Sequence, residues 1–238
     1  MRRAGRIVAD VRAQVAAAVR PGVTTKDLDR VAEQATKEAG AIPSFLGYRG
    51  FSASICTSVN EQIVHGIPGD RVLRDGDLLS LDFGAIWEGY HADSAITVFV
   101  GDPPSAEAEK LVQVTEEALE AAVGVIRTGN RLSDIGHTVQ QVVEGVGFSV
   151  VREYVGHGIG QNLHEDPQIP NFGPPGRGPE LRPGLVLAVE PMVNLGGWET
   201  RMLDDGWTVV TADGSLSAHF EHSIAITQDG PEVLTAAV

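Results

Sequence analysis

The sequence predicts an α/β fold made of two pseudo-symmetric halves, each combining a pair of helices with antiparallel strands. Three observations support this prediction: apolar residues at helical spacing in two separate regions, β-forming runs after each region, and an internal repeat that relates the two regions. With 238 residues the chain can build one large core. We expect one domain over 1–238, with halves at about 1–102 and 103–238.

Four helices are expected, in two consecutive pairs. Ile7, Val11, Val15 and Val19 recur at helical spacing, which predicts an amphipathic helix over about the first 20 residues, ending at Pro21. The remaining helices are expected from Thr25, as the N-cap, to Ala39, from Ala106 to Arg127, and from Ser133 toward Val146, followed by Gly40, Gly129 and Gly147.

The segment from Leu78 to Val100 is predicted to form a β-hairpin that turns at Glu88 and Gly89. Pairing about this turn places Asp93 opposite Gly84. Gly84 lies two residues after Asp82, on the same face of its strand, so both carboxylates point to one side of the sheet. At ~4 Å and an effective dielectric of ~20 they repel by about 4 kcal/mol. Such a pair requires a proton or a cation, and a cation is the sharper hypothesis.

An internal repeat relates the two halves. RPGVTTKDLDRVAEQATKEAG at 20–40 aligns without gaps on RTGNRLSDIGHTVQQVVEGVG at 127–147. LRDGDLLSLD at 73–82 then aligns on LRPGLVLAVE at 181–190 at nearly the same offset. The scaffold of helices and strands is therefore expected to occur twice.

The repeat also duplicates the carboxylates. Asp82 aligns on Glu190, and laying DSAITV on EHSIAI aligns Asp93 on Glu221. If the halves pack face to face, four acidic side chains meet in one cleft. Their combined charge of −4 is prohibitive without cations, and two divalent ions would neutralise it.

Three histidines lie beside the repeated strands. His157 lies between glycines in YVGHGIGQNLHEDPQIP, His164 follows it, and His65 precedes the first strand pair. An oxygen-rich set with one nitrogen suits Mn²⁺, Fe²⁺, Co²⁺ or catalytic Zn²⁺. The other four histidines, His91, His137, His219 and His222, are expected to be ordinary surface residues.

The composition excludes several classes of function. The net charge of −14 argues against binding to DNA or to an anionic membrane surface. No run is long and apolar enough to span a membrane. The single cysteine, Cys56, excludes an internal disulfide, so a cytoplasmic location is expected.

Five segments carry a family resemblance: GYRGFSASICTSVNEQIVHGIP, LSLDFGAIWEGYHADSAITVFVG, YVGHGIGQNLHEDPQIP, VLAVEPMVN and LSAHFEHSIAIT. In their order and spacing the chain resembles the type I methionine aminopeptidases, in the short bacterial form. The resemblance covers almost the whole chain. It implies one catalytic domain with the pita-bread fold, in which two pseudo-symmetric halves enclose a central metal site.

The resemblance also implies the site residues. Two divalent ions (Co, Mn, Fe or Zn) would be held by Asp82, Asp93, His157, Glu190 and Glu221, with Asp93 and Glu221 bridging both ions. His65 and His164 would contact the substrate and act in catalysis with Glu190. The methionine pocket would be formed by Tyr48, Phe51, Cys56 and Trp207.

The implied activity is removal of the N-terminal methionine from nascent polypeptides, with a preference for a small second residue. A water or hydroxide between the ions would attack the first peptide bond, with Glu190 moving its proton. A monomer is expected, and association with the ribosome is a family expectation. Two alternatives stay open: an Xaa-Pro-specific aminopeptidase or dipeptidase of the same fold, and a non-catalytic pita-bread module that binds protein or RNA.

Overall fold

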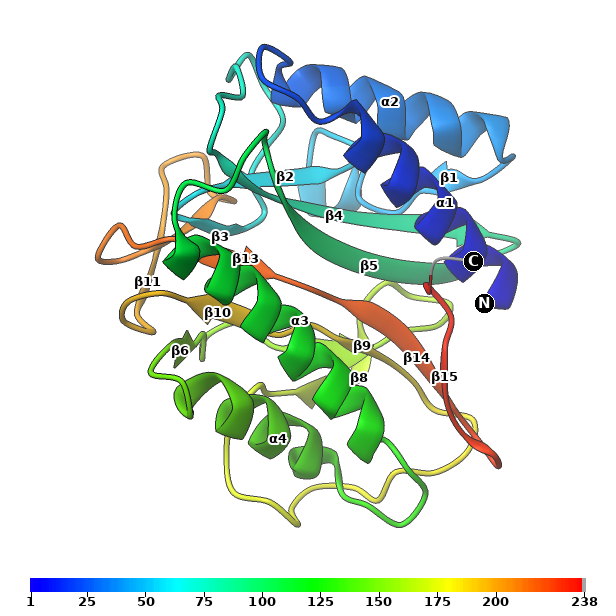
Figure 1. The fold of residues 1–238 in the computed structure, drawn as a ribbon. Coiled ribbons are helices and arrows are strands. Elements are labelled where there is room, and N and C mark those ends of the chain that lie inside the picture. The colour runs from blue at the N-terminus through cyan, green and yellow to red at the C-terminus, as the bar shows by residue number, and fades with distance from the viewer. Residues whose placement is uncertain (237–238) are drawn as a thin grey trace.

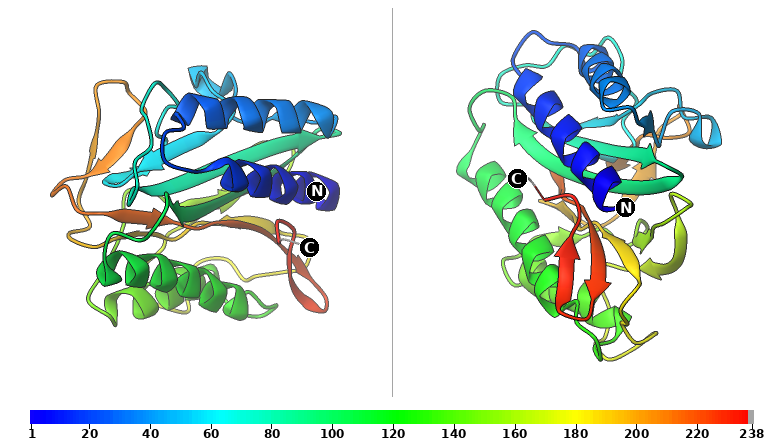
Figure 2. Two further views of the ribbon diagram at one scale, coloured as in Figure 1. Left: turned by 45° about the horizontal axis from the view of Figure 1, so that its top comes forward. Right: turned by 90° about the vertical axis from the view of Figure 1, so that its right-hand side faces the viewer.

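The computed structural model describes residues 1–236. Two helix pairs lie on opposite sides of the molecule with the strands between them (Figure 1), and the turned views show the same layers (Figure 2). None of the helices in this described part of the chain has the length and apolarity needed to cross a bilayer. The helices are α1 (Arg2–Ala18), α2 (Thr25–Glu38), α3 (Ala106–Val125) and α4 (Leu132–Glu144), with a 3₁₀ turn, η1 (Tyr48–Gly50).

The first helix pair forms as the apolar spacing predicted, but the cap of α2 differs. Thr24 is the N-cap: its Oγ1 accepts a hydrogen bond from the Asp27 N–H at 3.2 Å, and its own N–H donates to Asp27 Oδ2 at 3.1 Å. The prediction of Thr25 as the cap was wrong by one position. The Thr25 hydroxyl instead donates to the carbonyl of Gly69 at 3.0 Å.

The second helix pair ends earlier than predicted. α3 begins after Ser105, whose Oγ accepts the Ala108 N–H at 3.1 Å. It ends at Val125 rather than Arg127, and the Asn130 side chain donates to the Val125 carbonyl at 2.7 Å. The helix end is therefore satisfied by a side chain further along the loop, which apolar spacing does not reveal.

The strands form antiparallel sheets, as predicted. In the N-terminal half they are β1 (Ile42–Pro43), β2 (Cys56–Val59), β3 (Gln62–Val64), β4 (Leu78–Trp87) and β5 (Tyr90–Phe99). In the C-terminal half they are β6 (Ser149–Val150), β7 (Gly156–Gly158), β8 (Glu165–Ile169), β9 (Val186–Val189), β10 (Met192–Asn194), β11 (Thr200–Met202), β12 (Val209–Thr211), β13 (Ser217–His219), β14 (His222–Thr227) and β15 (Gly230–Val233).

The predicted hairpin has the expected register. β4 and β5 pair along their whole length, and Asp93 lies opposite Gly84. Glu88 and Gly89 connect them with φ values of 48° and 80°, the left-handed conformations of a two-residue turn that matches the strand twist. The turn chemistry therefore sets the face on which Asp82 and Asp93 lie.

The C-terminal half repeats this strand pair with a different connection. β9 pairs antiparallel with β14, and Val189 lies opposite His222. The chain between them forms β10 to β13, and β12 pairs with β3 of the N-terminal half. The second half thus extends across to the first.

The two halves meet along β5 and β14. The Ala95 N–H donates to the Glu221 carbonyl at 3.3 Å, and the Glu221 N–H donates to the Ala95 carbonyl at 2.9 Å. The Ser223 hydroxyl accepts the Asp93 N–H and donates to the Asp93 carbonyl, both at 2.9 Å. These bonds hold the backbones of two carboxylate-bearing residues side by side.

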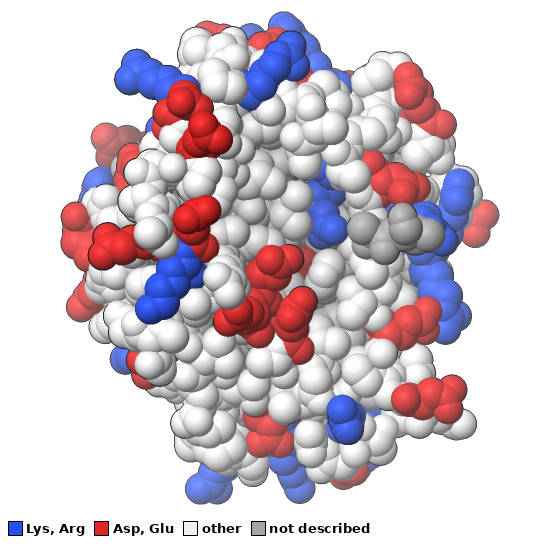
Figure 3. Space-filling view, in the orientation of Figure 1, with Lys and Arg blue, Asp and Glu red and all other residues white. Residues whose placement is uncertain are grey.

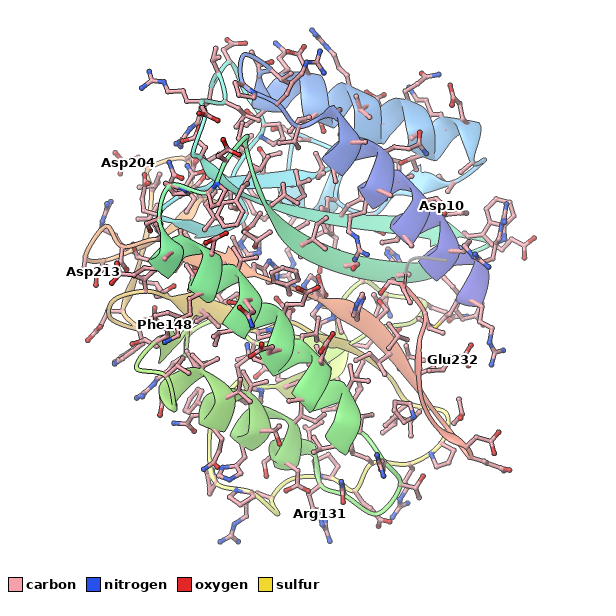
Figure 4. The ribbon with its side chains drawn as sticks, viewed as in Figure 1. Asp10, Arg131, Phe148, Asp204, Asp213 and Glu232 are labelled. Atoms are coloured by element: carbon pink, nitrogen blue, oxygen red, sulfur yellow. The ribbon has the colours of Figure 1, made fainter. Side chains whose placement is uncertain are left out.

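Each half has its own apolar core. One core lies between α1, α2 and the first strands and includes Leu28 and Phe83; the other lies under α3 and α4 and includes Leu111 and Leu187. Ile96 of β5 packs against both. At the rim, Glu232 of β15, labelled in Figure 4, accepts two hydrogen bonds from Arg2 of α1 at 2.6 and 2.7 Å.

The exposed face of α3 is acidic. In Figure 3 red side chains gather over the middle of this helix, whose exposed residues include Glu116, Glu117 and Glu120. Lys and Arg side chains on this view are interspersed with acids rather than joined in one basic patch. This face agrees with the net charge of −14 and does not favour a nucleic-acid phosphate backbone.

Candidate metal centre

Four carboxylates from the two halves converge on one cavity. Asp82 lies on β4 and Asp93 on β5, while Glu190 follows β9 and Glu221 precedes β14. Asp93 and Glu221 are only 4% and 2% exposed. The alternation of the hairpin and its repeat thus produce the convergence that the sequence predicted.

One imidazole joins the carboxylates. A carboxylate oxygen of Asp93, one of Glu221 and a ring nitrogen of His157 all lie within 4.8 Å of one another. The Nε2 atom of His157 also lies 3.6 Å from Oε1 of Glu190. The nearby Asp93 carboxylate is one of the groups that raise the pKa of Asp82.

Burial makes this cluster difficult to charge. It raises the pKa of Asp82, Glu190 and Glu221 well above the ordinary values, and the neighbouring carboxylates raise them further. Burial raises the pKa of Asp93 to about 7, while hydrogen bonds from Asp82 and the Ser94 backbone limit the rise. A set of acids held together in this way binds either protons or cations.

The carboxylates also present oxygens without partners. Among the described residues, Oδ1 of Asp82, Oδ1 of Asp93 and Oε1 of Glu221 are buried and accept no hydrogen bond. An unsatisfied buried polar atom costs about 1–3 kcal/mol, more when the group is charged. Divalent cations would remove this cost, so the donor set fits a divalent-metal centre of oxygen atoms with one nitrogen.

The orientation of His157 is fixed by its backbone surroundings. Its Nδ1 lies 2.9 Å from the carbonyl oxygen of Gly158, and this oxygen can only accept a hydrogen bond. Nδ1 therefore carries the proton, and the Nε2 lone pair faces the carboxylates. Burial lowers the pKa of His157, which favours the neutral, ligating form.

Two further histidines lie at the cavity. The His164 ring lies 4.2 Å from the His157 ring between centroids, and its Nδ1 is 2.9 Å from the Tyr48 hydroxyl. His65 has a positive φ of 61° and contacts Trp207 edge-on. Burial lowers the pKa of each to about 4, so both are neutral at pH 7.

The cavity contains every residue that the sequence singled out for the site. Its volume is about 140 Å³. Its lining includes the five expected metal ligands, Asp82, Asp93, His157, Glu190 and Glu221, and the two histidines His65 and His164. It also includes the four expected pocket residues, Tyr48, Phe51, Cys56 and Trp207.

The apolar side of the cavity is built from aromatic rings and one thiol. Phe51 meets Trp207 edge-on with ring centroids 5.1 Å apart. Cys56 lies opposite Asp82 in the sheet and is 4% exposed. Burial, and then the nearby carboxylates, raise the pKa of this thiol, so Cys56 lines the cavity as a small uncharged group.

Sequence reasoning did not assign some residues of this region. Phe45 and Arg49 also line the cavity. Arg12 of α1 is buried and donates to the Ser94 hydroxyl, which donates to the Glu221 carbonyl at 2.6 Å. Arg49 stands between aromatic residues of a resemblance segment, which is a usable signal, whereas the Arg12 contact depends on the packing of α1.

His219 was expected at the surface, and this prediction is wrong. Its side chain is buried, with the residue 1% exposed, and its Nε2 lies 3.7 Å from Oε2 of Glu190. Burial lowers the pKa of His219 to about 3. His222 is partly buried, and its Nδ1 lies 2.8 Å from the Thr235 hydroxyl. The repeat gave no signal for the burial of His219 because its neighbours Met192 and Thr97 come from different halves.

Comparison with known proteins agrees with this geometry. The sequence profile of metallopeptidase family M24 matches residues 1–228. Methionine aminopeptidase 1 of Bacillus subtilis is 57% identical over 235 residues, which cover 99% of this chain and 94% of the relative. Methionine aminopeptidase of Clostridium perfringens is 54% identical with the same coverage.

Solved structures give the same assignment. The crystal structure of methionine aminopeptidase from Thermotoga maritima superposes with a TM-score of 0.98 at 47% identity, covering 100% of this chain and 95% of that one. Prolidase from Pyrococcus furiosus superposes with a TM-score of 0.79 at 20% identity, and 63% of its chain is covered, so it shares the fold. The expected pita-bread fold is confirmed. The chain belongs to metallopeptidase family M24 and, within that family, groups with the bacterial methionine aminopeptidases.

Proposed function

We propose that this protein is a metal-dependent aminopeptidase that removes the N-terminal methionine from newly made polypeptides. One observation carries the proposal: buried carboxylates with oxygens that lack a partner among the described residues, joined by one oriented imidazole, line a cavity whose other wall is apolar. The names of the relatives that match almost the whole chain support the substrate. The preference for a small second residue is part of the same proposal.

Two divalent cations, of Mn²⁺, Fe²⁺, Co²⁺ or Zn²⁺, are proposed as the cofactor. When bound, they would polarise the scissile carbonyl and acidify a water molecule toward a pKa of about 7. They would be held by Asp82, Asp93, His157, Glu190 and Glu221, the five predicted ligands that line the cavity. Asp93 and Glu221 are the proposed shared ligands. Their backbones lie side by side across the seam between the halves, which is formed by β5 and β14.

Glu190 is the proposed proton carrier. Its pKa is raised by burial and by Asp93, so its carboxylate accepts a proton more readily than an exposed glutamate does. It lies at the cavity wall beside His157. From there it would take the proton of the attacking water and deliver it to the leaving amine.

The two cavity histidines are proposed to hold the substrate amide. If the Tyr48 hydroxyl donates to Nδ1 of His164, the Nε2 of that ring keeps its proton and is a hydrogen-bond donor. This N–H would stabilise the charge that develops on the carbonyl oxygen. His65, held against Trp207 and Tyr154, would orient the amide beyond the scissile bond.

The apolar wall is proposed to select the thioether side chain. Phe51 and Trp207 offer ring faces and edges, which attract a polarisable sulfur, and Cys56 adds a small uncharged surface. An apolar wall of this kind suits an unbranched, uncharged side chain. The N-terminal amine would lie near the carboxylates.

The proposal also covers the domain organisation, the cellular location and the oligomeric state. Because residues of both predicted halves, about 1–102 and 103–238, line one cavity, we treat the chain as one catalytic unit. We propose action in the cytoplasm, as a monomer, on N-termini of chains emerging from the ribosome. The acidic face of α3 does not favour binding to ribosomal RNA on that side, because its carboxylates repel RNA phosphates.

The test compares activities of the metal-free protein after reconstitution with each cation. Mn²⁺, Fe²⁺, Co²⁺ and Zn²⁺ are added separately, and hydrolysis of Met-Ala-Ser is measured beside Leu-Ala-Ser and an Ala-Pro-Ser peptide. We expect cleavage of Met-Ala-Ser alone, restored by at least one cation. Preferred cleavage of Ala-Pro-Ser would establish the Xaa-Pro alternative, and tight metal binding without cleavage would establish the non-catalytic one.

A further inference from the structure

His219 occupies an enclosed position at the end of β13. Its backbone is held by Thr97 of β5: the His219 N–H donates to the Thr97 hydroxyl at 2.8 Å, and that hydroxyl donates to the His219 carbonyl at 2.9 Å. Strand pairing with Met192 holds the other side. With 1% of the residue exposed, the imidazole cannot turn to solvent.

Both ring nitrogens of His219 lack a hydrogen-bond partner among the described residues. A neutral imidazole carries one N–H, and a buried donor left unpaired costs about 1–3 kcal/mol. Oε2 of Glu190, a hydrogen-bond acceptor, lies 3.7 Å from Nε2. A shift of about 0.5 Å would bring this pair to hydrogen-bond distance.

Glu190 thus lies between two imidazoles, one beside each carboxylate oxygen. His157 approaches Oε1 at 3.6 Å with its lone pair, because its Nδ1 proton is directed to Gly158. His219 approaches Oε2. The backbone of Glu190 is held separately, since the Asn171 side chain donates to its carbonyl at 2.9 Å. Among residues 1–236 the carboxylate itself makes no hydrogen bond, and the two rings approach it at 3.6 and 3.7 Å.

We propose that His219 is a positioning residue: its Nε2–H donates to Oε2 of Glu190 and fixes the rotation of this carboxylate. The inference rests on the proposed role of Glu190 as a metal ligand and proton carrier. With Oε2 held by His219, Oε1 keeps its lone pairs directed toward His157 and the cavity. A carboxylate free to rotate would bind metal less tightly and carry the proton less efficiently.

The test compares His219→Leu, which removes the donor, with His219→Gln, whose amide N–H can replace it. His137→Gln, at a histidine outside the cavity, is the matched control. The measurements are kcat and KM on Met-Ala-Ser, and Mn²⁺ affinity by calorimetry. We expect His219→Leu to lower kcat and Mn²⁺ affinity by about 10- to 100-fold with little change in KM. His219→Gln should restore most of both.

Two results with the variants would overturn the proposal. In one, His219→Leu keeps wild-type kcat and Mn²⁺ affinity; in the other, His219→Gln is as impaired as His219→Leu, which would assign the effect to the shape of the ring. Should the leucine variant not fold, ¹⁵N NMR of the wild-type protein loaded with Zn²⁺ reports the tautomer. The Nε2–H form supports the proposal, and the Nδ1–H form contradicts it.

Failure of this inference is separable from failure of the proposed function. If the wild-type protein with metal does not cleave Met-Ala-Ser, the proposed function fails. If the wild type cleaves it and His219→Leu is equally active, only the role of His219 fails.

Discussion

The two halves place their acids on similar strands but connect those strands in different ways. In the N-terminal half, Glu88 and Gly89 alone join β4 to β5, and both aspartates lie within paired strands. In the C-terminal half, residues 190–221 join β9 to β14, and both glutamates lie just outside the paired residues. The additional methylene of each glutamate extends its reach from these strand ends.

The difference separates two tasks. The strand pairs common to both halves hold the carboxylates, whereas the long connection of the C-terminal half forms part of the apolar side of the cavity. That connection carries Trp207, and its strand β12 pairs with β3, which directly precedes His65. Repetition therefore accounts for the metal centre, and the departure from repetition accounts for the apolar wall.

The largest expected effect tests whether Asp93 and Glu221, at corresponding positions of the two halves, are equally important for metal binding. Asp93→Asn and Glu221→Gln should each abolish Mn²⁺ binding at one position and lower kcat/KM on Met-Ala-Ser on the order of 10³-fold, or ~4 kcal/mol. Asp229→Asn, in the exposed turn between β14 and β15, is the control. If either ligand variant retained metal and activity, Asp93 and Glu221 would not be equivalent ligands.

The pH dependence of stability and of Mn²⁺ affinity tests the role of Asp93 further. Because the pKa of Asp93 is raised to about 7 from an ordinary 3.8, the metal-free fold gains stability from this group below pH about 4 and loses it as pH rises through 7. Cations compete with the proton, so Mn²⁺ affinity should increase as pH rises through 7, with proton release. Calorimetry in buffers of different ionisation enthalpy measures this release, and its absence at pH 6 would contradict the expectation.

The two cavity histidines should differ from the ligands. His164→Ala is expected to lower kcat by about 10²-fold while Mn²⁺ affinity stays unchanged, since we propose that His164 contacts the substrate rather than the metal. His65→Ala should act mainly through orientation and raise KM as well. Because their pKa values are about 4, neither should titrate between pH 6 and 8. Loss of metal in either variant would make that histidine a ligand.

The smallest expected effect concerns the seam between the halves. Ser223→Ala removes the hydroxyl that bonds both backbone groups of Asp93, and the free energy of unfolding should fall by about 1–3 kcal/mol. Urea denaturation measures it, with the exposed Ser52→Ala as control. An unchanged free energy of unfolding would show that β5 and β14 stay aligned through their backbone hydrogen bonds alone.

Much of the fold followed from local patterns. The helix pairs, the hairpin and the pairing of Asp93 with Gly84 were predicted from spacing and turn residues, because these depend on neighbours in the chain. Helix ends were less accurate: Thr24 rather than Thr25 caps α2, because both threonines have an oxygen and only the fold decides which one faces Asp27.

By itself the sequence determined the repeated halves, the four acids at corresponding positions and the histidine between glycines. Only the tertiary structure decided that His219 lies behind Glu190 and that Arg12 reaches Ser94. Periodicity reports which face of its own strand or helix a side chain occupies. Which side chain lies across from it depends on how the two halves are docked, and that is set by packing between residues far apart in the chain.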